Sequence, residues 1–330
     1  RTRQSMTFTL RVERRIKAEP FDVVHAISPC RCADIYQPRG GTVAESVERN
    51  LALLGTRSAR RLKRWGNLMN FKQRYMLGLE RDIMREGGTP VIVAISDYVA
   101  RQLKTHYGLP DRRIRKIRNA VDPDDSSEST RQANREAIRR EFGIGPGDCL
   151  VLLVAHNFRL KGVARWMEAL GRLVKEGTGD VRSLIVGKGD SPPWQRRARR
   201  LGITRYLTFA GPSQRIREFF HAADVLVHPT YYDPCSRVVL EAMSTGLPCV
   251  TTRWDGASEQ IVDGENGFVL EDPDETATLA DRIGRLRDAA LRETFSRNCA
   301  ALRDSLHMER HATEMLTLYD EVASWNDARG

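Results

Sequence analysis

Apolar runs alternate with amphipathic segments along the chain, most regularly in its second half. The pattern predicts strands at 150–155, 184–187, 207–210, 224–228 and 247–252, and helices at 163–174, 194–201, 215–222 and directly after Ser236. Such alternation indicates a parallel sheet with helices on both faces and with ligands at the carboxyl ends of its strands. We therefore expect a doubly wound α/β domain over residues 123–310.

The first half predicts a second Rossmann-like α/β domain over residues 1–122. Its strands are expected at 21–25, 91–95 and 114–117, and a basic helix at 11–17 precedes them. Because a Rossmann-like domain normally begins with a strand, we expect the first strands of this domain to be missing. The polar segment 119–127 fits a turn better than a metal motif. The terminal segment, 311–330, belongs to an amphipathic helix that we expect to pack back towards the N-terminal domain.

The stretch from Asp224 to Thr252 contains two candidate ligand-binding acids, Asp233 and Glu241. Ser236 can cap a helix whose apolar residues lie on one side, and Gly246 can end it. Asp233 then lies in the turn before this helix, and Glu241 lies about two turns inside it. Two acids placed in this way can hold one ligand at two points. The alternative is an ordinary loop acid and a solvated helix acid.

The spacing from Asp233 to Glu241, followed by Gly246-Leu-Pro, resembles the signature of retaining sugar-nucleotide glycosyltransferases of family 4, which have the GT-B fold. The resemblance implies two Rossmann-like domains facing a cleft. It also implies that Glu241 binds the ribose of the donor and that Asp233, which stands where Glu is usual, aligns the transferred sugar. The segment with Cys235, Ser236 and Arg237 replaces the usual Pro-Phe-Gly pattern but still offers main-chain N–H groups to phosphate or sugar oxygens.

A second loop resembles the phosphate loop of the same family. Lys161 and Gly162 match that pattern, whereas His156 stands where Arg is usual, and Arg159 is the cation expected to reach in instead. Cations here would stabilise the charge that develops on the departing nucleoside diphosphate. The resemblance therefore gives Lys161 both a binding and a catalytic role. The alternative is an ordinary surface lysine at the start of a helix.

Two further loops complete the predicted site. Gly187 and Gly189 follow a strand, and their lack of a side chain permits backbone to approach a base or ribose. Asp34 lies in an Ala-Asp-Ile-Tyr segment that is similar to an acceptor-side loop of the bacterial lipopolysaccharide-core glucosyltransferases, the branch of the family that the chain most resembles. This similarity implies a catalytic position for Asp34. The alternative for Asp34 is a turn cap.

The segment 57–85 carries nine Lys or Arg residues against two acids. Its apolar residues recur at near-helical spacing, at Leu62, Trp65, Met69, Met76, Leu79 and Ile83. The pattern predicts a basic amphipathic helix or helix pair. The apolar stripe either packs on the domain or docks on an anionic membrane, where each basic residue near the surface contributes about 1 kcal/mol. Docking would suit a lipid-linked acceptor.

Composition narrows the classes of function. With 330 residues, 41% apolar and 29% charged, the chain can form two globular domains and is not of the disordered class. The net charge of +10 favours nucleotide phosphate or anionic lipid as a neighbour, and no module or aromatic platform for nucleic acid is present. The six cysteines show no C-x-x-C spacing, which predicts reduced thiols. With no apolar run of about 20 residues, we expect a cytoplasmic protein, peripheral at most on the inner face of the membrane.

Together the motifs predict a retaining hexosyltransferase. It would move a hexose, glucose from UDP-glucose in the first place, to a hydroxyl of a lipid-linked or glycan acceptor such as lipopolysaccharide core, in biosynthesis of the cell envelope. No metal or other cofactor is expected, because Lys161 and main-chain amides would supply the charge stabilisation. The alternative is a catalytically weak sugar-nucleotide-binding or accessory protein, which the departures at Asp233 and His156 leave open.

Overall fold

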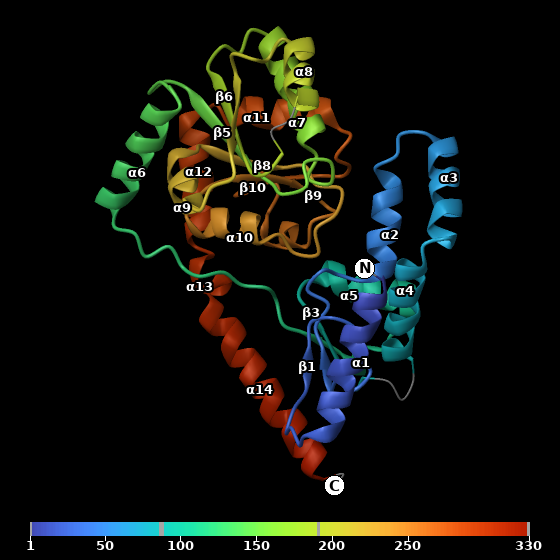
Figure 1. The fold of residues 1–330 in the computed structure, drawn as a ribbon. Coiled ribbons are helices and arrows are strands. Elements are labelled where there is room, and N and C mark those ends of the chain that lie inside the picture. The colour runs from blue at the N-terminus through green and yellow to red at the C-terminus, as the bar shows by residue number, and fades with distance from the viewer. Residues whose placement is uncertain (1, 86–88, 190–191, 329–330) are drawn as a thin grey trace. The chain divides into compact units, whose positions relative to one another are not determined.

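The structure, a computed structural model, describes residues 2–85, 89–189 and 192–328, and the chain divides into two units (Figure 1). Unit 1 contains Arg1–Asn119, Asp233–Cys235 and Glu309–Gly330, and unit 2 contains Ala120–Tyr232 and Ser236–Met308. The first change of unit lies close to the boundary that the polar segment suggested. The short insertion Asp233–Cys235 was not expected.

Unit 1 is built on a four-stranded parallel sheet in the order β1-β2-β3-β4. Its elements are β1 (His25–Ala26), β2 (Ile35–Tyr36), β3 (Val91–Ala94), β4 (Ile114–Lys116), α1 (Thr2–Ala18), α2 (Val43–Ala52), α3 (Arg57–Leu68), α4 (Phe71–Met84), α5 (Asp97–Tyr107) and α14 (Met308–Asp327). The strand predicted at 21–25 is present only at its end. Just before it, the N–H of Val24 donates to the carboxylate of Asp34 at 2.8 Å, and the carbonyl oxygen of Val24 accepts from the N–H of Ile35 at 3.1 Å.

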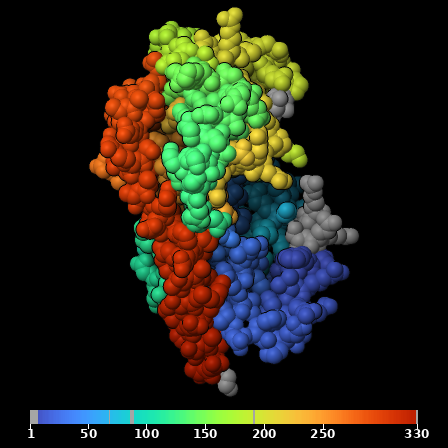
Figure 2. Space-filling model, turned by 90° about the vertical axis from the view of Figure 1, so that its left-hand side faces the viewer, coloured from blue at the N-terminus to red at the C-terminus, as the bar shows by residue number. Residues whose placement is uncertain are grey.

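The terminal helix α14 packs onto the sheet of unit 1. Met315, Leu318 and Val322 share a buried apolar cluster with Ile35 of β2 and Val93 of β3. Figure 2 shows α14, in red, alongside the blue N-terminal part of this unit. The C-terminal helix is therefore a structural part of the N-terminal unit.

Unit 2 has a six-stranded parallel sheet in the order β10-β9-β8-β5-β6-β7. Its elements are β5 (Cys149–Val154), β6 (Val181–Val186), β7 (Leu207–Gly211), β8 (Val225–His228), β9 (Cys249–Thr252), β10 (Gly267–Leu270), α6 (Glu128–Glu141), α7 (Val163–Lys175), α8 (Pro192–Leu201), α9 (Ile216–Ala222), α10 (Arg237–Ser244), α11 (Thr276–Arg285), α12 (Ala289–Ala300) and α13 (Arg303–Leu306). The predicted doubly wound sheet is confirmed. The strand order reverses between β5 and β8, which is where such sheets bind ligands.

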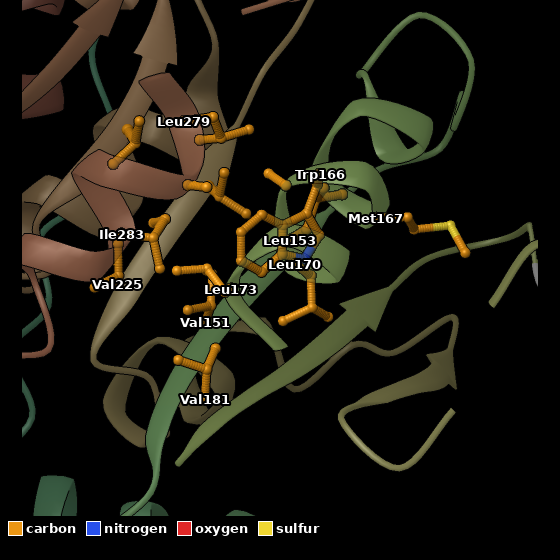
Figure 3. Close-up of a cluster of buried hydrophobic side chains, with 14 of the residues drawn as sticks. Val151, Leu153, Trp166, Met167, Leu170, Leu173, Val181, Val225, Leu279 and Ile283 are labelled. Atoms are coloured by element: carbon orange, nitrogen blue, oxygen red, sulfur yellow. The ribbon is translucent and has the colours of Figure 1, made fainter. Parts of the chain in front are cut away.

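The core of unit 2 fixes α7 against this sheet (Figure 3). Trp166 is fully buried, and its indole N–H donates to Ser183 Oγ at 2.8 Å, so its polar atom is satisfied. Leu170 and Leu173 continue the apolar face of α7 towards Ile283 of α11. Full burial of each such side chain contributes about 1.5–3 kcal/mol. Because β5 and α7 are both held by this core, the loop that joins them has a fixed position.

Candidate functional site

The loop from β5 to α7, residues 155–162, lies at the switch point of the unit 2 sheet. Gly162 caps α7 with a positive φ of 68°, and a Cβ there would lie 1.9 Å from the carbonyl oxygen of Pro229. Gly187 also has a positive φ, 143°, and a Cβ there would lie 1.7 Å from the carbonyl oxygen of Ala155. The loops after β5, β6 and β8 are therefore packed backbone against backbone, and only glycine fits at both contacts.

Lys161 is anchored at this junction. Its half-buried side chain donates from Nζ to the carbonyl oxygen of Tyr232 at 3.3 Å, and its N–H donates to Asn157 O at 2.9 Å. His156 and Arg159 are exposed on the same loop. The three basic residues that the phosphate-loop resemblance implied are thus present together at the carboxyl edge of unit 2.

Gly189 completes the group of loop residues. A Cβ on Gly189 would lie 2.6 Å from the ring of Phe158, so the loop after β6 lies directly on the loop after β5. Gly187 and Gly189 therefore serve the packing of these loops. Their approach to a base or ribose stays a prediction.

The N-terminus of α10 is the second part of the site. Ser236 caps the helix as predicted, because its Oγ accepts from the N–H of Val239 at 3.4 Å. The N–H groups of Arg237 and Val238 lie in the first turn, where an α-helix supplies no acceptor of its own. This end of the helix also carries partial positive charge, so it suits an anionic ligand.

Glu241 lies further along α10 and lines a polar cavity of about 320 Å³. The cavity is also lined by Asp122, Asp124, Gln214, Ile216, Arg217, Phe220, Ser244 and Thr245. Burial raises the pKa of Glu241, while the guanidinium of Arg237, 3.4 Å away, acts in the opposite direction. A half-buried carboxylate that opens into a cavity can accept hydrogen bonds from the hydroxyl groups of a ligand.

Asp233 and Cys235 group with unit 1 and not with Glu241. The carbonyl oxygen of Pro234 accepts from Ser96 Oγ at 2.7 Å, and that of Cys235 accepts from Asn119 Nδ2 at 3.3 Å. Ser96 and Asn119 follow β3 and β4, so the segment lies at the carboxyl ends of these strands. The two acids of the signature therefore belong to different units.

Asp34 lies at the opposite ends of the strands in unit 1. It directly precedes β2, and its carboxylate holds the N–H of Val24 before β1. The structure thus shows a structural contact of the kind that the turn-cap alternative describes. The catalytic role of Asp34 stays a prediction.

Three hydrogen-bonded side chains next to the loop after β8 were not predicted from the sequence, and we call this group the brace. Its members are Tyr231, Asp274 and Arg165. Tyr231 donates from its hydroxyl to Asp274, and Arg165 Nε donates to both, at 2.8 Å to the hydroxyl and 2.7 Å to the carboxylate. Burial, followed by the bond to Asp274, raises the pKa of Tyr231 to about 12. The main-chain N–H of Tyr231 also donates to Leu160 O at 2.9 Å. The brace therefore holds the turn against the loop that carries Lys161.

The basic segment 57–85 forms two helices, α3 and α4 (Figure 1). Leu79 and Ile83 of α4 are buried, but Leu62, Trp65 and Met69 in and after α3 are 76%, 72% and 75% exposed. A single stripe packed on the domain is therefore wrong for α3, because the turn at Asn70 separates its apolar residues from those of α4. Among the described residues, no helix has both the length and the apolar character needed to span a bilayer.

Two family models together match most of the chain. Glycosyltransferase Family 4 matches residues 1–125, and Glycosyl transferases group 1 matches residues 149–288. The chain belongs to the family 4 glycosyltransferases. The prediction of an enzyme of this class is confirmed, and each match falls mainly within one of the two units.

The chain is also similar in sequence to individual glycosyltransferases. The lipopolysaccharide glucosyltransferase WaaG of Escherichia coli is 25% identical over 310 residues, which cover 93% of this chain and 80% of WaaG. A D-inositol 3-phosphate glycosyltransferase of Nocardia farcinica is 31% identical over 220 residues, which cover 62% of this chain and 48% of that enzyme. The similarity thus includes relatives named for different acceptors.

Solved structures confirm the GT-B fold. The crystal structure of WaaG superposes with a TM-score of 0.77 at 24% identity, over 92% of this chain and 80% of WaaG. The structure of Anabaena HepE in complex with UDP-glucose superposes with a TM-score of 0.67 at 19% identity, over 87% of this chain and 72% of HepE. The two parallel sheets of this glycosyltransferase are therefore those of the GT-B class.

Proposed function

We propose that this glycosyltransferase transfers a hexose with retention of configuration, from UDP-glucose to a hydroxyl of a lipid-linked or glycan acceptor such as lipopolysaccharide core. The observation that carries the proposal is the junction in unit 2, where Lys161 lies on the loop held by Gly162 and Gly187. The likeness to WaaG, a lipopolysaccharide glucosyltransferase, and to HepE in complex with UDP-glucose supports this donor and acceptor.

In this reaction the site must stabilise the negative charge that develops on the leaving group. As the bond between sugar and phosphate breaks, negative charge builds on the departing diphosphate, and positioned donors lower that barrier. The donors in this proposal are Lys161 Nζ, the side chains of His156 and Arg159, and the N–H groups of Arg237 and Val238. Glu241 binds the ribose hydroxyls, and Asp233 aligns the sugar. The leaving phosphate takes the proton of the acceptor hydroxyl on the same face. No metal or other cofactor enters the scheme, because Lys161 and the main-chain amides supply the charge stabilisation.

The variant Glu241→Gln tests the ribose contact. We expect its Kd for UDP-glucose to rise about tenfold, because bonds from hydroxyls to a charged carboxylate are roughly twice as strong as those to a neutral group. Isothermal titration calorimetry measures this change. The control is Glu176→Gln, at the exposed C-terminus of α7. Equal affinity in Glu241→Gln and the unaltered chain would remove Glu241 from the donor site.

A panel of nucleotide sugars tests the donor itself. Thermal shift selects the ligand that stabilises the protein, since a ligand at 100 times its Kd adds about 2.7 kcal/mol to stability. Release of nucleoside diphosphate from that donor then distinguishes an enzyme from the alternative, a catalytically weak binding protein. We expect the largest shift and the highest rate with UDP-glucose, and binding without turnover would favour the alternative.

We also propose that α3 docks this enzyme on anionic membrane. The exposed residues Leu62, Trp65 and Met69 lie among Arg57, Arg60, Arg61, Lys63 and Arg64, and Phe71 and Lys72 follow at the start of α4. Apolar side chains within a basic face are the composition that interfacial helices use. A peripheral position on the cytoplasmic membrane would bring the enzyme to a lipid-linked acceptor.

Charge reversal tests the docking proposal. We expect the triple variant Lys63→Glu, Arg64→Glu, Lys72→Glu to lose most of its co-sedimentation with vesicles of anionic phosphatidylglycerol, because each basic residue contributes about 1 kcal/mol near the surface. The matched control reverses Arg196, Arg199 and Arg200, which are exposed on α8 of unit 2. Equal sedimentation of the two triple variants would contradict docking through α3.

A further inference from the structure

We propose that Asp255 is a positioning residue for transfer, which acts by fixing the N-terminus of α10. Asp255 lies after β9, in a turn that leads into a short 3-10 helix, Gly256–Gln260, and its side chain is completely buried. The inference rests on the proposed function, in which the first N–H groups of α10 receive the donor diphosphate. It adds a residue that lies outside the phosphate loop and the acidic signature.

The carboxylate of Asp255 joins three parts of unit 2. Oδ1 accepts from the N–H of Ser236 at 3.0 Å and from the N–H of Ala257 at 2.9 Å. Oδ2 accepts from the hydroxyl of Thr251, at the end of β9, at 3.0 Å. A single buried side chain therefore connects the cap of α10 to the adjacent strand and turn.

The side chain of the cap residue Ser236 has a contact of its own with the sheet. The ring Nε2 of His228, at the end of β8, lies 3.5 Å from Ser236 Oγ, and Thr251 Oγ1 lies 2.9 Å from His228 O. Ser236, His228 and Thr251 are all buried. The main chain of the cap and its side chain are thus both held to strands of the sheet.

This arrangement matters for catalysis because Ser236 directly precedes two of the proposed donors. The N–H groups of Arg237 and Val238 come next in the chain, and their direction is set by the position of the cap. Groups that stabilise a transition state must be held close to their productive geometry, and a displacement of about 1 Å can lower the rate about 100-fold. Removal of the Asp255 carboxylate frees the N–H that anchors the cap.

The amide of asparagine can replace the carboxylate in geometry but not in charge. In Asp255→Asn, Oδ1 can still accept from both N–H groups, and Nδ2 can donate to Thr251 Oγ1, whose hydrogen then bonds to His228 O. A role in positioning therefore predicts that Asp255→Asn retains activity and that Asp255→Ala does not. A role through negative charge predicts that both variants fail.

The experiment measures UDP release from UDP-glucose in the presence of acceptor, together with binding of UDP by calorimetry. We expect Asp255→Ala to lower kcat about tenfold or more and to weaken UDP binding, and Asp255→Asn to stay within about threefold of the unaltered enzyme. The control is Asp288→Ala, which removes an exposed helix cap of α12 in the same unit. We expect that control to lower the melting temperature without a change in kcat or KM.

Each outcome decides between the explanations. Unchanged kcat and KM in folded Asp255→Ala, or an Asp255→Asn variant as impaired as Asp255→Ala, would overturn the inference. If Asp255→Ala fails to fold, Thr251→Val decides, since it leaves the Asp255 carboxylate in place, removes the bond to Oδ2 together with the contact to His228 O, and is expected to lower kcat about threefold or more. An unchanged rate there overturns the inference too. Absence of turnover in the unaltered chain overturns the proposed function, and the inference with it.

Discussion

The variant Lys161→Met is expected to lower kcat by about 100- to 1000-fold, the usual cost of removing one preorganised donor from a developing charge. Methionine retains an unbranched, apolar stem of similar length but has no ammonium group. In the structure, Lys161 Nζ is held against Tyr232 O, at 3.3 Å, on a loop whose glycines leave no room for another arrangement. Steady-state measurement of nucleoside diphosphate release from UDP-glucose gives this effect.

The matched control for this variant is Lys175→Met, because Lys175 lies at the exposed end of the helix that Lys161 precedes. We expect Lys175→Met to leave kcat unchanged. A loss below about threefold in Lys161→Met would place the stabilising charge elsewhere, with Arg159 as the first residue to replace next.

The variant Gly162→Ala is expected to lower the free energy of unfolding by at least about 3 kcal/mol, because it combines a strained backbone with a steric clash. The φ of 68° is unfavourable for any residue with a Cβ, and this Cβ would lie 1.9 Å from Pro229 O. Relief of the clash requires the loops after β5 and β8 to separate, and Lys161 would move with them. Urea denaturation measures the change in stability, and the transfer rate measures the accompanying loss of activity.

Gly177→Ala separates backbone strain from the clash. Gly177 follows α7 and has a φ of 84°, but a Cβ there would have no atom within 4 Å. We expect this control to cost only about 1 kcal/mol, the strain of a positive φ, and to leave the transfer rate unchanged. Equal destabilisation in the two variants would mean that contact with Pro229 does not constrain the loop.

Residues whose role is local could be predicted from the sequence. The runs that became β5, β6 and β8 are apolar and bounded by glycine or polar turns, so their pattern alone placed the loop of Lys161 at the carboxyl ends of strands. The cap at Ser236 was predictable for the same reason, since a hydroxyl before an apolar helix needs no distant partner. These features placed the loops, whereas the class of enzyme was implied by the family resemblance of the motifs at Lys161 and at Asp233 and Glu241.

Residues whose role depends on distant partners could not be found in this way. Asp255 and Tyr231 look like ordinary turn residues until the fold brings Ser236 to one and Asp274 to the other. The grouping of Asp233 with unit 1 depends on Ser96 and Asn119, more than a hundred positions away in the chain, whose bonds hold the main chain beside it. No periodicity in the sequence records such contacts.

The sequence pattern also could not predict that the apolar residues of α3 are exposed. Apolar residues at helical spacing predicted a basic amphipathic helix or helix pair for the segment 57–85, but periodicity does not say what covers the apolar face. Leu79 packs inside unit 1, whereas Trp65 is exposed. The same pattern therefore serves a buried face in α4 and an exposed face in α3.

Transfer of glucose from UDP-glucose with retention of configuration can be followed in a single reaction mixture. Proton NMR of the enzyme with UDP-glucose and a lipopolysaccharide-core acceptor follows the anomeric signals of donor and product. We expect the α-anomeric signal of UDP-glucose to decline while an α-glycosidic signal of the product and an equal amount of UDP appear. A β-glycosidic product would contradict retention, and unchanged UDP-glucose in a sample that binds UDP would contradict transfer.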